Sequence, residues 1–213
     1  MKDFKKLFKH LIPFTVHDPQ TTRTPFAPSK GTLTIELFWS SAPNTCRNFA
    51  ALAERKYYDN TVIHRIVKDR ILQAGDPTGT GRGGESIYGG YFADEIDSEL
   101  KHLPGMVASA NAGPNMNKSQ FYITLATCQT LDKKSTIFGK VIPPGLEILK
   151  RFNSVKTDKR NCPLESCKIV RAQVRESLTG QAESAENPDD ESDDDDSLGK
   201  DAERNNLGSY FIS

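Results

Sequence analysis

Two polar stretches set in strand-forming sequence carry the side chains best suited to bind a polar ligand. In the first, IHRIVKDRILQAGDPTGT (residues 63–80), Arg65 and Gln73 are flanked by β-branched and apolar residues. The second, SANAGPNMNKSQFY, follows at residues 109–122. A desolvated guanidinium needs acceptors for its several N–H donors, so the pattern predicts a groove in which Arg65 binds a ligand's carbonyl oxygen. The alternative is that Arg65 is an ordinary strand residue facing water.

Other motifs with possible chemistry are weaker. The loop GTGRGG at residues 79–84 matches the pattern G-x-G-x-x-G, but no strand–helix unit surrounds it, and a structural loop is expected rather than a nucleotide site. The four cysteines form no CxxC pair and have no ligand-like spacing to the four histidines. We therefore expect free thiols in a reducing compartment, no metal site and no cofactor.

The 213-residue chain has a net charge of zero, but its charges are sorted along the sequence. Residues 1–30 carry six Lys/Arg against two Asp/Glu, residues 31–171 carry 19 against 14, and residues 172–213 carry 3 against 12. This sorting predicts a basic N-terminal extension (1–30), a folded domain (31–175) and an acidic, disordered tail (176–213). No apolar run reaches the roughly 18 residues that span a bilayer, so no membrane span is expected.

The N-terminal segment KDFKKLFKHLIPF places its apolar residues at helical spacing and its lysines on the other side. It predicts a short basic amphipathic helix that docks on a partner or an anionic surface, or else packs against its own domain. Pro13 limits this helix, and residues 15–30 are expected to form an extended connector.

From residue 31 the pattern changes to short strands. Alternating apolar residues predict a strand over 32–39, followed by a helix capped by Ser40 or Ser41 that runs to about Lys56, with Cys46, Phe49, Ala50 and Ala53 buried. Further strands are expected at 61–66, 71–74, 105–110, 120–124, 136–142 and 168–174, and a second helix at 144–154. This order predicts a mainly β fold, a closed antiparallel barrel capped by helices.

Three blocks in this order resemble the cyclophilin family of peptidyl-prolyl cis-trans isomerases: HRIVKDRILQAGDPTGTGRGG, ANAGPNMNKSQFYITLA and TIFGKV. The resemblance covers roughly residues 31–172 and implies an eight-stranded closed barrel with two capping helices. The segments DPTGTGRGGESIYG and GLEILKRF look closest to the small spliceosome-associated isomerase-like cyclophilins. A monomer in the nucleus is then implied, with the cytoplasm as the alternative location and with proline-containing peptides and spliceosomal proteins as partners. Direct nucleic-acid binding is not expected, because the domain lacks an aromatic and basic stripe.

The resemblance also implies site residues. Arg65 would hydrogen-bond the prolyl nitrogen, Gln73 would orient the guanidinium, and the backbone of Asn111 would hold the substrate chain. The proline pocket would be lined by Ile71, Gln73, Ala110, Asn111, Gln120, Tyr122 and Leu131. His64 would be a structural support.

Five residues of the implied pocket wall depart from the family pattern, which has phenylalanine, methionine, phenylalanine, tryptophan and histidine at the positions of Arg70, Ile71, Tyr122, Thr130 and Ser135. Loss of the aromatic wall predicts an isomerase that holds proline less tightly and binds ciclosporin poorly. The alternative is a catalytically weak or inactive proline-peptide-binding scaffold module of a ribonucleoprotein complex.

Overall fold

The computed structural model describes residues 8–18 and 29–178 of the chain. These residues form a nine-stranded sheet, two α-helices and a short 3-10 helix. In chain order the elements are β1 (Phe8–Asp18), β2 (Ser29–Leu37), α1 (Pro43–Glu54), β3 (Arg65–Val67), β4 (Ile71–Ala74), β5 (Met106–Ser109), β6 (Phe121–Thr124), η3 (Gln129–Leu131), β7 (Ile137–Ile142), α2 (Gly145–Phe152), β8 (Ile169–Ala172) and β9 (Arg175–Leu178).

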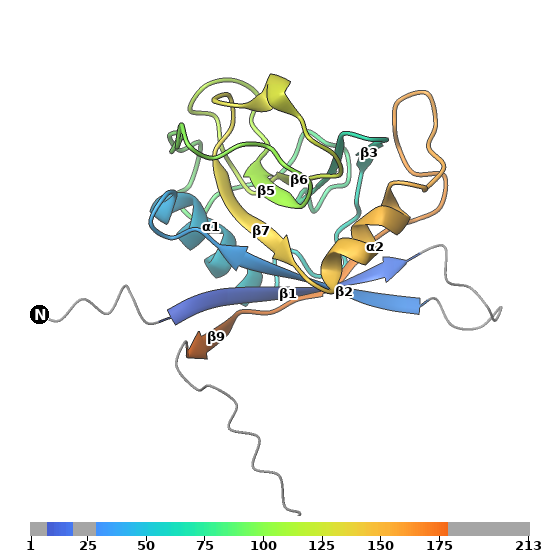
Figure 1. Ribbon diagram of the computed structural model, residues 1–213, viewed down its shortest axis with the longest axis horizontal. Helices are drawn as coiled ribbons and strands as arrows, with labels where there is room; N and C mark the ends of the chain where they lie inside the picture. Colours follow the sequence, from blue (N-terminus) through green and yellow to red (C-terminus); the bar gives the residue numbers. More distant parts are fainter. Residues whose placement is uncertain (1–7, 19–28, 179–213) are drawn as a thin grey trace, which may run out of the picture. The chain divides into compact units, whose positions relative to one another are not determined.

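The sheet is antiparallel throughout, with the strand order β3-β4-β6-β5-β7-β2-β1-β8 and with β9 paired to β1 outside this path. Figure 1 shows α1 and α2 to the left and right of β7. The mainly β prediction with two helices is confirmed, and most of the expected elements are found within two or three residues of their predicted bounds.

The expected closed eight-stranded barrel is wrong, because the sheet is an open half-barrel. Its outer strands β3 and β8 share no ladder. The segment before β3 touches β8 through one isolated bridge, Val62 to Lys168, with Ile63 N donating to Cys167 O and Ile169 N donating to Thr61 O, each at 2.9 Å. β3 itself begins only at Arg65 and pairs with β4, and its Ile66 N donates to the carbonyl of Asn161, outside β8, so the contact between the two edges is limited to this bridge.

The predicted N-terminal helix is also wrong, since residues 8–18 form β1. Ile12, Phe14 and Val16 are buried and alternate with half-buried neighbours, the period of a strand. β1 pairs with β2 over eight residue pairs, from Leu11–Glu36 to Asp18–Ser29. The folded sheet therefore begins well before residue 31.

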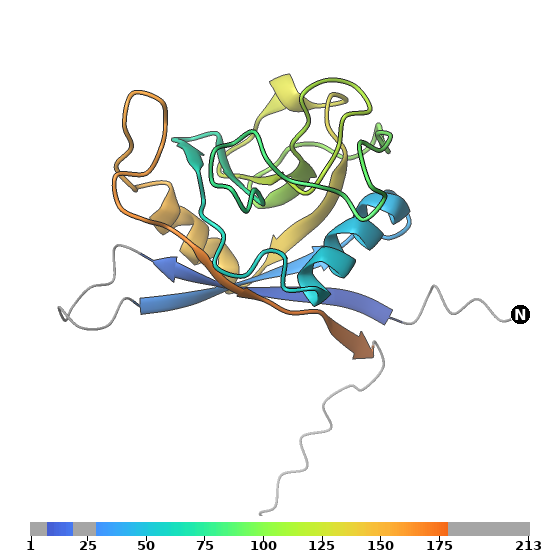
Figure 2. The same cartoon turned by 180° about the vertical axis from the view of Figure 1, so that it is seen from behind.

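The C-terminal boundary moves as well. β8 and β9 lie one after the other along β1 (Figure 2), so residues 176–178 belong to the sheet and not to the acidic tail. The remaining parts of the predicted extension and tail, residues 1–7, 19–28 and 179–213, lie outside the described residues.

Helix α1 begins at Pro43, and the predicted cap by Ser40 or Ser41 is wrong. The residue before the helix is Ala42, and no side-chain hydrogen bond caps it. Instead Glu95, from a loop 50 residues away, accepts from the backbone N–H groups of Asn44 and Thr45 at 3.0 and 2.8 Å, and from Thr45 Oγ1 at 2.7 Å. A carboxylate at this position satisfies free N–H groups and complements the helix dipole.

Two apolar clusters lie on opposite faces of strands β4 and β6. The large core contains Leu72, Ala74, Phe121 and Ile123 together with most buried side chains of α1, α2 and β1. The smaller cluster, on the other face, is built on Ile71, Ala108, Tyr122 and Ile137. Neither helix in the described part of the chain is long and apolar enough to cross a membrane.

Candidate active site

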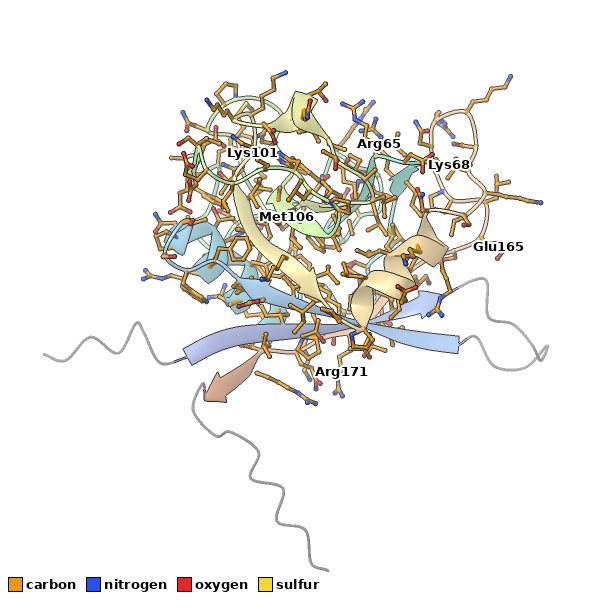
Figure 3. The ribbon with its side chains drawn as sticks, viewed as in Figure 1. Arg65, Lys68, Lys101, Met106, Glu165 and Arg171 are labelled. Carbon is orange, nitrogen blue, oxygen red and sulfur yellow. The ribbon has the colours of Figure 1, made fainter. Side chains whose placement is uncertain are left out.

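Arg65 and Gln73 lie side by side in a row that crosses four strands. Arg65 of β3 pairs with Gln73 of β4, Gln73 with Tyr122 of β6, and Tyr122 with Ala108 of β5. Directly paired residues in antiparallel strands project from the same face of a sheet, so these side chains share the face that carries the smaller apolar cluster. Arg65 is exposed, and Figure 3 shows it at the β3 edge, close to Lys68 and far from Arg171.

A chain of amide hydrogen bonds orients the middle of this row. Gln73 Nε2 donates to Gln120 Oε1 at 2.9 Å, and Gln120 Nε2 donates to the carbonyl of Gly83, also at 2.9 Å. Ala110 N donates to the carbonyl of Gln120 at 3.0 Å, which holds the segment after β5 against the start of β6. Asn111, next in the chain, is half-buried, and its Nδ2 contacts the carbonyl of Lys134 at 3.4 Å. The structure thus brings Arg65, Gln73, Ala110, Asn111 and Gln120 to one region.

The floor beside these polar groups is apolar. Ile71 and Tyr122 are 8% and 5% exposed, and the partly buried Ala110 and Leu131 pack against their cluster. Because Ile71 lies two residues from Gln73 on β4, its side chain leaves the same face of the sheet.

A network of buried Tyr122 and His102 and partly exposed Asp132 supports this floor. Tyr122 Oη lies 2.8 Å from His102 Nε2, and Asp132 Oδ1 lies 2.8 Å from His102 Nδ1 and accepts from the His102 backbone N–H at 2.9 Å. A neutral His102 that donates from Nδ1 to the carboxylate accepts the Tyr122 hydroxyl at Nε2, so each polar atom has a partner.

The environment shifts the acidity of both ends of this network. Burial raises the pKa of Tyr122 to about 12, and a side-chain hydrogen bond with Ser135 opposes the shift. Hydrogen bonds from the His102 backbone and ring hold the pKa of Asp132 below its usual value. Tyr122 therefore stays a neutral phenol whose hydroxyl is turned to His102 and Ser135. No local sequence signal pointed to His102, which is 20 residues from Tyr122 and 30 from Asp132.

Two of the expected wall residues line another part of the surface, although the Arg70 charge still acts on Tyr122 and opposes the rise in its pKa that burial causes. Arg70 and Thr130 are exposed and line a second surface hollow with Val67, Lys68, Asp69, Thr127, Cys128 and Gln129. This hollow shares no residue with the one formed around Gln73, Asn111 and Gln120. Ser135 is half-buried and reaches the site through Tyr122.

The glycine-rich loop folds around a buried carboxylate. Asp76 is fully buried and accepts from Thr78 N at 2.8 Å, Gly81 N at 2.7 Å and Gly83 N at 3.1 Å. Burial alone would raise the pKa of Asp76, but these hydrogen bonds and one from the Thr78 hydroxyl lower it below its usual value. Gly81 and Gly84 have φ of 77° and 104°, which a side chain would disfavour. The loop is thus an internally bonded structural loop.

Sequence reasoning overlooked the outer part of the hollow beside the site. It is lined by Arg82, Tyr91, Met116 and Lys118, in addition to Gln73, Asn111 and Gln120. Met116 and Lys118 lie within a stretch singled out from the sequence, but Tyr91 comes from a loop with no recognisable motif. Among the described residues no cluster of His, Cys, Asp or Glu is placed to hold a metal ion, and all four cysteines are free thiols.

Comparison with known proteins places this geometry in a family. Residues 22–174 match the model of the cyclophilin type peptidyl-prolyl cis-trans isomerase/CLD family. A peptidyl-prolyl cis-trans isomerase of Arabidopsis thaliana is 56% identical over 147 residues, 68% of this chain and 89% of the relative. A Neurospora crassa protein named peptidyl-prolyl cis-trans isomerase-like 1 is 57% identical over 145 residues, 68% of this chain and 88% of the relative.

Solved structures agree with the sequence comparison. The crystal structure of a cyclophilin type peptidyl-prolyl cis-trans isomerase from Cryptosporidium parvum has a TM-score of 0.70 and 39% identity, and covers 79% of this chain and 98% of its own. The same enzyme crystallised in the presence of the dipeptide Ala-Pro gives the same TM-score and identity and covers 78% of this chain. The chain belongs to the cyclophilin family of peptidyl-prolyl cis-trans isomerases.

Proposed function

We propose that this isomerase acts on exposed X-Pro bonds through Arg65, Gln73 and Asn111, with reduced efficiency, on client proteins of the spliceosome in the nucleus. The observation that carries the proposal is the row in which Arg65 pairs with Gln73 and Gln73 with Tyr122, because it sets a cation and an amide beside an apolar floor.

The reaction needs no covalent step. Rotation about an X-Pro bond meets a barrier of about 18–20 kcal/mol, and a catalyst must bind the twisted amide more tightly than either planar form. Rotation breaks amide resonance and makes the prolyl nitrogen more basic, so the Arg65 guanidinium is suited to donate to it. Gln73 holds the guanidinium and the rotating carbonyl in line, and the main chain of Asn111 binds the substrate backbone. Fixed donors of this kind contribute several kcal/mol to a transition state.

Arg65→Ala tests this assignment in a protease-free NMR exchange assay on Xaa-Pro peptides. We expect kcat/KM to fall by about 100-fold, because the loss of a preorganised donor has an effect of this size. Arg65 is exposed, so its removal is not expected to unfold the domain. Arg171→Ala is the matched control, since Arg171 is exposed far from the site (Figure 3). Equal exchange rates for the two variants would contradict the assigned role of Arg65.

Reduced efficiency follows from the wall of the proline pocket. The resemblance to the family implies phenylalanine and tryptophan at the positions of Arg70 and Thr130, which are both exposed here, and the Arg70 charge acts on Tyr122 of the floor. A proline ring on this floor would therefore bury less apolar surface. Arg70→Phe is expected to raise kcat/KM by about fivefold, equivalent to about 1 kcal/mol of added apolar contact. No increase, with folding unchanged, would count against the wall as the cause.

The proposed clients and location rest on the resemblance to small spliceosome-associated isomerase-like cyclophilins. Two measurements test them: imaging of the tagged full chain, and identification of the proteins that purify with it. Enrichment in the nucleus together with splicing proteins is expected. A cytoplasmic protein that purifies without them would refute this part of the proposal and leave the enzymatic part standing.

A further inference from the structure

The hollow around Gln73, Asn111 and Gln120 adjoins the proposed catalytic row at Gln73. Gln73 belongs to the row and lines the hollow together with Asn111 and Gln120, and the outer end is lined by Gly81, Arg82, Tyr91, Met116 and Lys118. Because the rise of an extended peptide is about 3.3 Å per residue, a peptide held over Arg65 and Gln73 passes this hollow within a few residues of its proline. The hollow is therefore placed to receive a neighbouring side chain of the same substrate.

The hollow carries positive charge without a balancing carboxylate. Arg82 and Lys118 are its two charged residues, and no Asp or Glu lines it. In the adjoining loops, Asp76 accepts from the N–H groups of its own loop, and Asp94 accepts from Asn115 N at 2.8 Å and Asn117 Nδ2 at 2.7 Å. Glu85 is exposed and does not line the hollow. Neither Arg82 nor Lys118 forms an ion pair with any described residue.

Both cations are held on fixed backbone. Lys118 Nζ lies 4.6 Å from the centre of the Tyr91 ring, a cation–π contact, and the Lys118 carbonyl accepts from Asn48 Nδ2 of α1 at 2.9 Å. Arg82 lies between Gly81 and Gly83, whose N–H groups both bind the buried Asp76 carboxylate. A ligand bound here therefore orders little backbone, which favours affinity.

The same loop is joined to the catalytic row. Gln120 donates to the carbonyl of Gly83, next to Arg82, and accepts from Gln73. The position of the Arg82 loop is thus fixed relative to Gln73 by two hydrogen bonds.

We propose that this hollow binds an anionic side chain, a carboxylate or a phosphate, carried by the substrate within about three residues of its proline. Arg82 and Lys118 are then specificity-determining residues, and the enzyme prefers acidic or phosphorylated X-Pro segments. The inference rests on the proposed isomerase site, whose activity on neutral peptides is measured separately in the test below.

The test uses the full-length protein and peptides with one Xaa-Pro bond. A single Glu is moved through the three positions before and after the proline, with Gln at the same position as the neutral partner. A parallel series carries phosphoserine against serine. NMR exchange gives kcat/KM, and amide chemical-shift titration gives Kd. At one position we expect a preference of about three- to tenfold for Glu over Gln. A preference for phosphoserine alone would assign the hollow to phosphate, and a preference for both would assign it to either anion.

A double variant, Arg82→Gln with Lys118→Gln, removes both charges and should bring the ratio of kcat/KM for the Glu peptide to that for the Gln peptide close to one. The matched control is Arg55→Gln with Lys159→Gln, which removes the same charge from exposed positions outside the hollow and should keep the preference. The preference should also fall as salt is raised toward 1 M, because screening weakens attraction at exposed charges.

The outcomes separate the two proposals. Turnover of neutral peptides without an anionic preference at any position, or a preference that survives in the Arg82/Lys118 pair, would overturn this inference alone. Absence of exchange on every peptide would overturn the proposed activity, and the Kd ratio between Glu and Gln peptides would still decide whether the hollow selects anions.

Discussion

At the scale of single residues, Tyr122 links the floor of the site to a polar network beneath it. Its hydroxyl reaches His102, and His102 reaches Asp132. The His102 side chain has no exposed surface, so its ring nitrogens depend on these two partners. The tyrosine at this position therefore does more than shape the floor, because its hydroxyl is the hydrogen-bond partner of His102 Nε2.

Tyr122→Phe should lower the free energy of unfolding by about 1–3 kcal/mol, since it leaves His102 Nε2 buried without a partner. Urea denaturation at neutral pH measures this change. Tyr88→Phe is the matched control: it also removes a hydrogen-bonded hydroxyl, at a side chain that is 44% exposed, and should change stability by less than about 1 kcal/mol. A neutral result for Tyr122→Phe would mean that the network contributes nothing to stability.

The raised pKa of Tyr122 predicts a loss of stability at high pH. Burial raises this pKa to about 12, from 10.0 for a free tyrosine. Below the free value both the folded and the unfolded protein keep the proton, and the contribution of the neutral phenol is fully present. As pH rises toward 12 the unfolded chain ionises first, so stability falls by up to about 2–3 kcal/mol.

The pH effect is isolated by comparing the protein with Tyr122→Phe. Burial also raises the pKa of Tyr58, but Tyr58 is present in both proteins, so its effect cancels in the comparison. The difference in unfolding free energy between the two proteins should shrink between pH 10 and 12. Parallel pH profiles over that range would show that Tyr122 does not titrate as its burial implies.

At the scale of elements, α1 is completed by a residue from another part of the chain. Pro43 begins the helix, but the carboxylate that receives its first free N–H groups is that of Glu95, whose own N–H binds Thr136 Oγ1 at 2.8 Å. The helix start, the loop before β5 and the residue before β7 are thus held together by the side chain and backbone of one residue.

Glu95→Ala should destabilise the protein by about 1–2 kcal/mol, the usual effect of losing a helix cap together with its charge. Thermal and urea unfolding measure it. Glu99→Ala, at an exposed position of the same loop, is the control and should lie within about 0.5 kcal/mol of the parent protein. Equal effects of the two substitutions would contradict the capping role.

At the scale of the described domain, the N-terminal strand is part of the core. Phe14 of β1 is 2% exposed, and its ring centre lies 5.4 Å from that of Phe49 in α1 and 5.9 Å from that of Phe121 in β6. Deleting residues 1–30 would remove β1 and expose this cluster. Such a deletion therefore reports on folding and cannot serve to map a partner-binding extension.

Phe14→Ala should lower the free energy of unfolding by about 3–5 kcal/mol, the range for an aromatic side chain removed from a packed core. Leu164→Ala, at a side chain that is 65% exposed, is the control and should have little effect. The measurement is urea denaturation followed by circular dichroism. A small effect of Phe14→Ala would mean that β1 does not contribute to the core as its burial indicates.

The sequence by itself was sufficient for the mainly β fold, the two helices and the family. Periodicity predicted α1, because Cys46, Phe49 and Ala53 lie at helical spacing and are buried. The three sequence blocks predicted the isomerase family, since short motifs of fixed spacing can be read directly from the amino-acid sequence. These features depend on residues close to one another in sequence.

The tertiary structure alone decided the features that depend on distant residues. Phe8, Leu11 and Ile12 fit helical spacing, whereas Ile12, Phe14 and Val16 have the period of a strand, and pairing with β2 decides for the strand, so the helix prediction was wrong. The Glu95 cap and the Tyr122–His102–Asp132 network join residues from separate parts of the chain. The open edge between β3 and β8 likewise depends on how distant strands are placed. These features are stabilised by backbone and side-chain groups that come into contact only in the folded chain. No local pattern of residue types predicts such contacts.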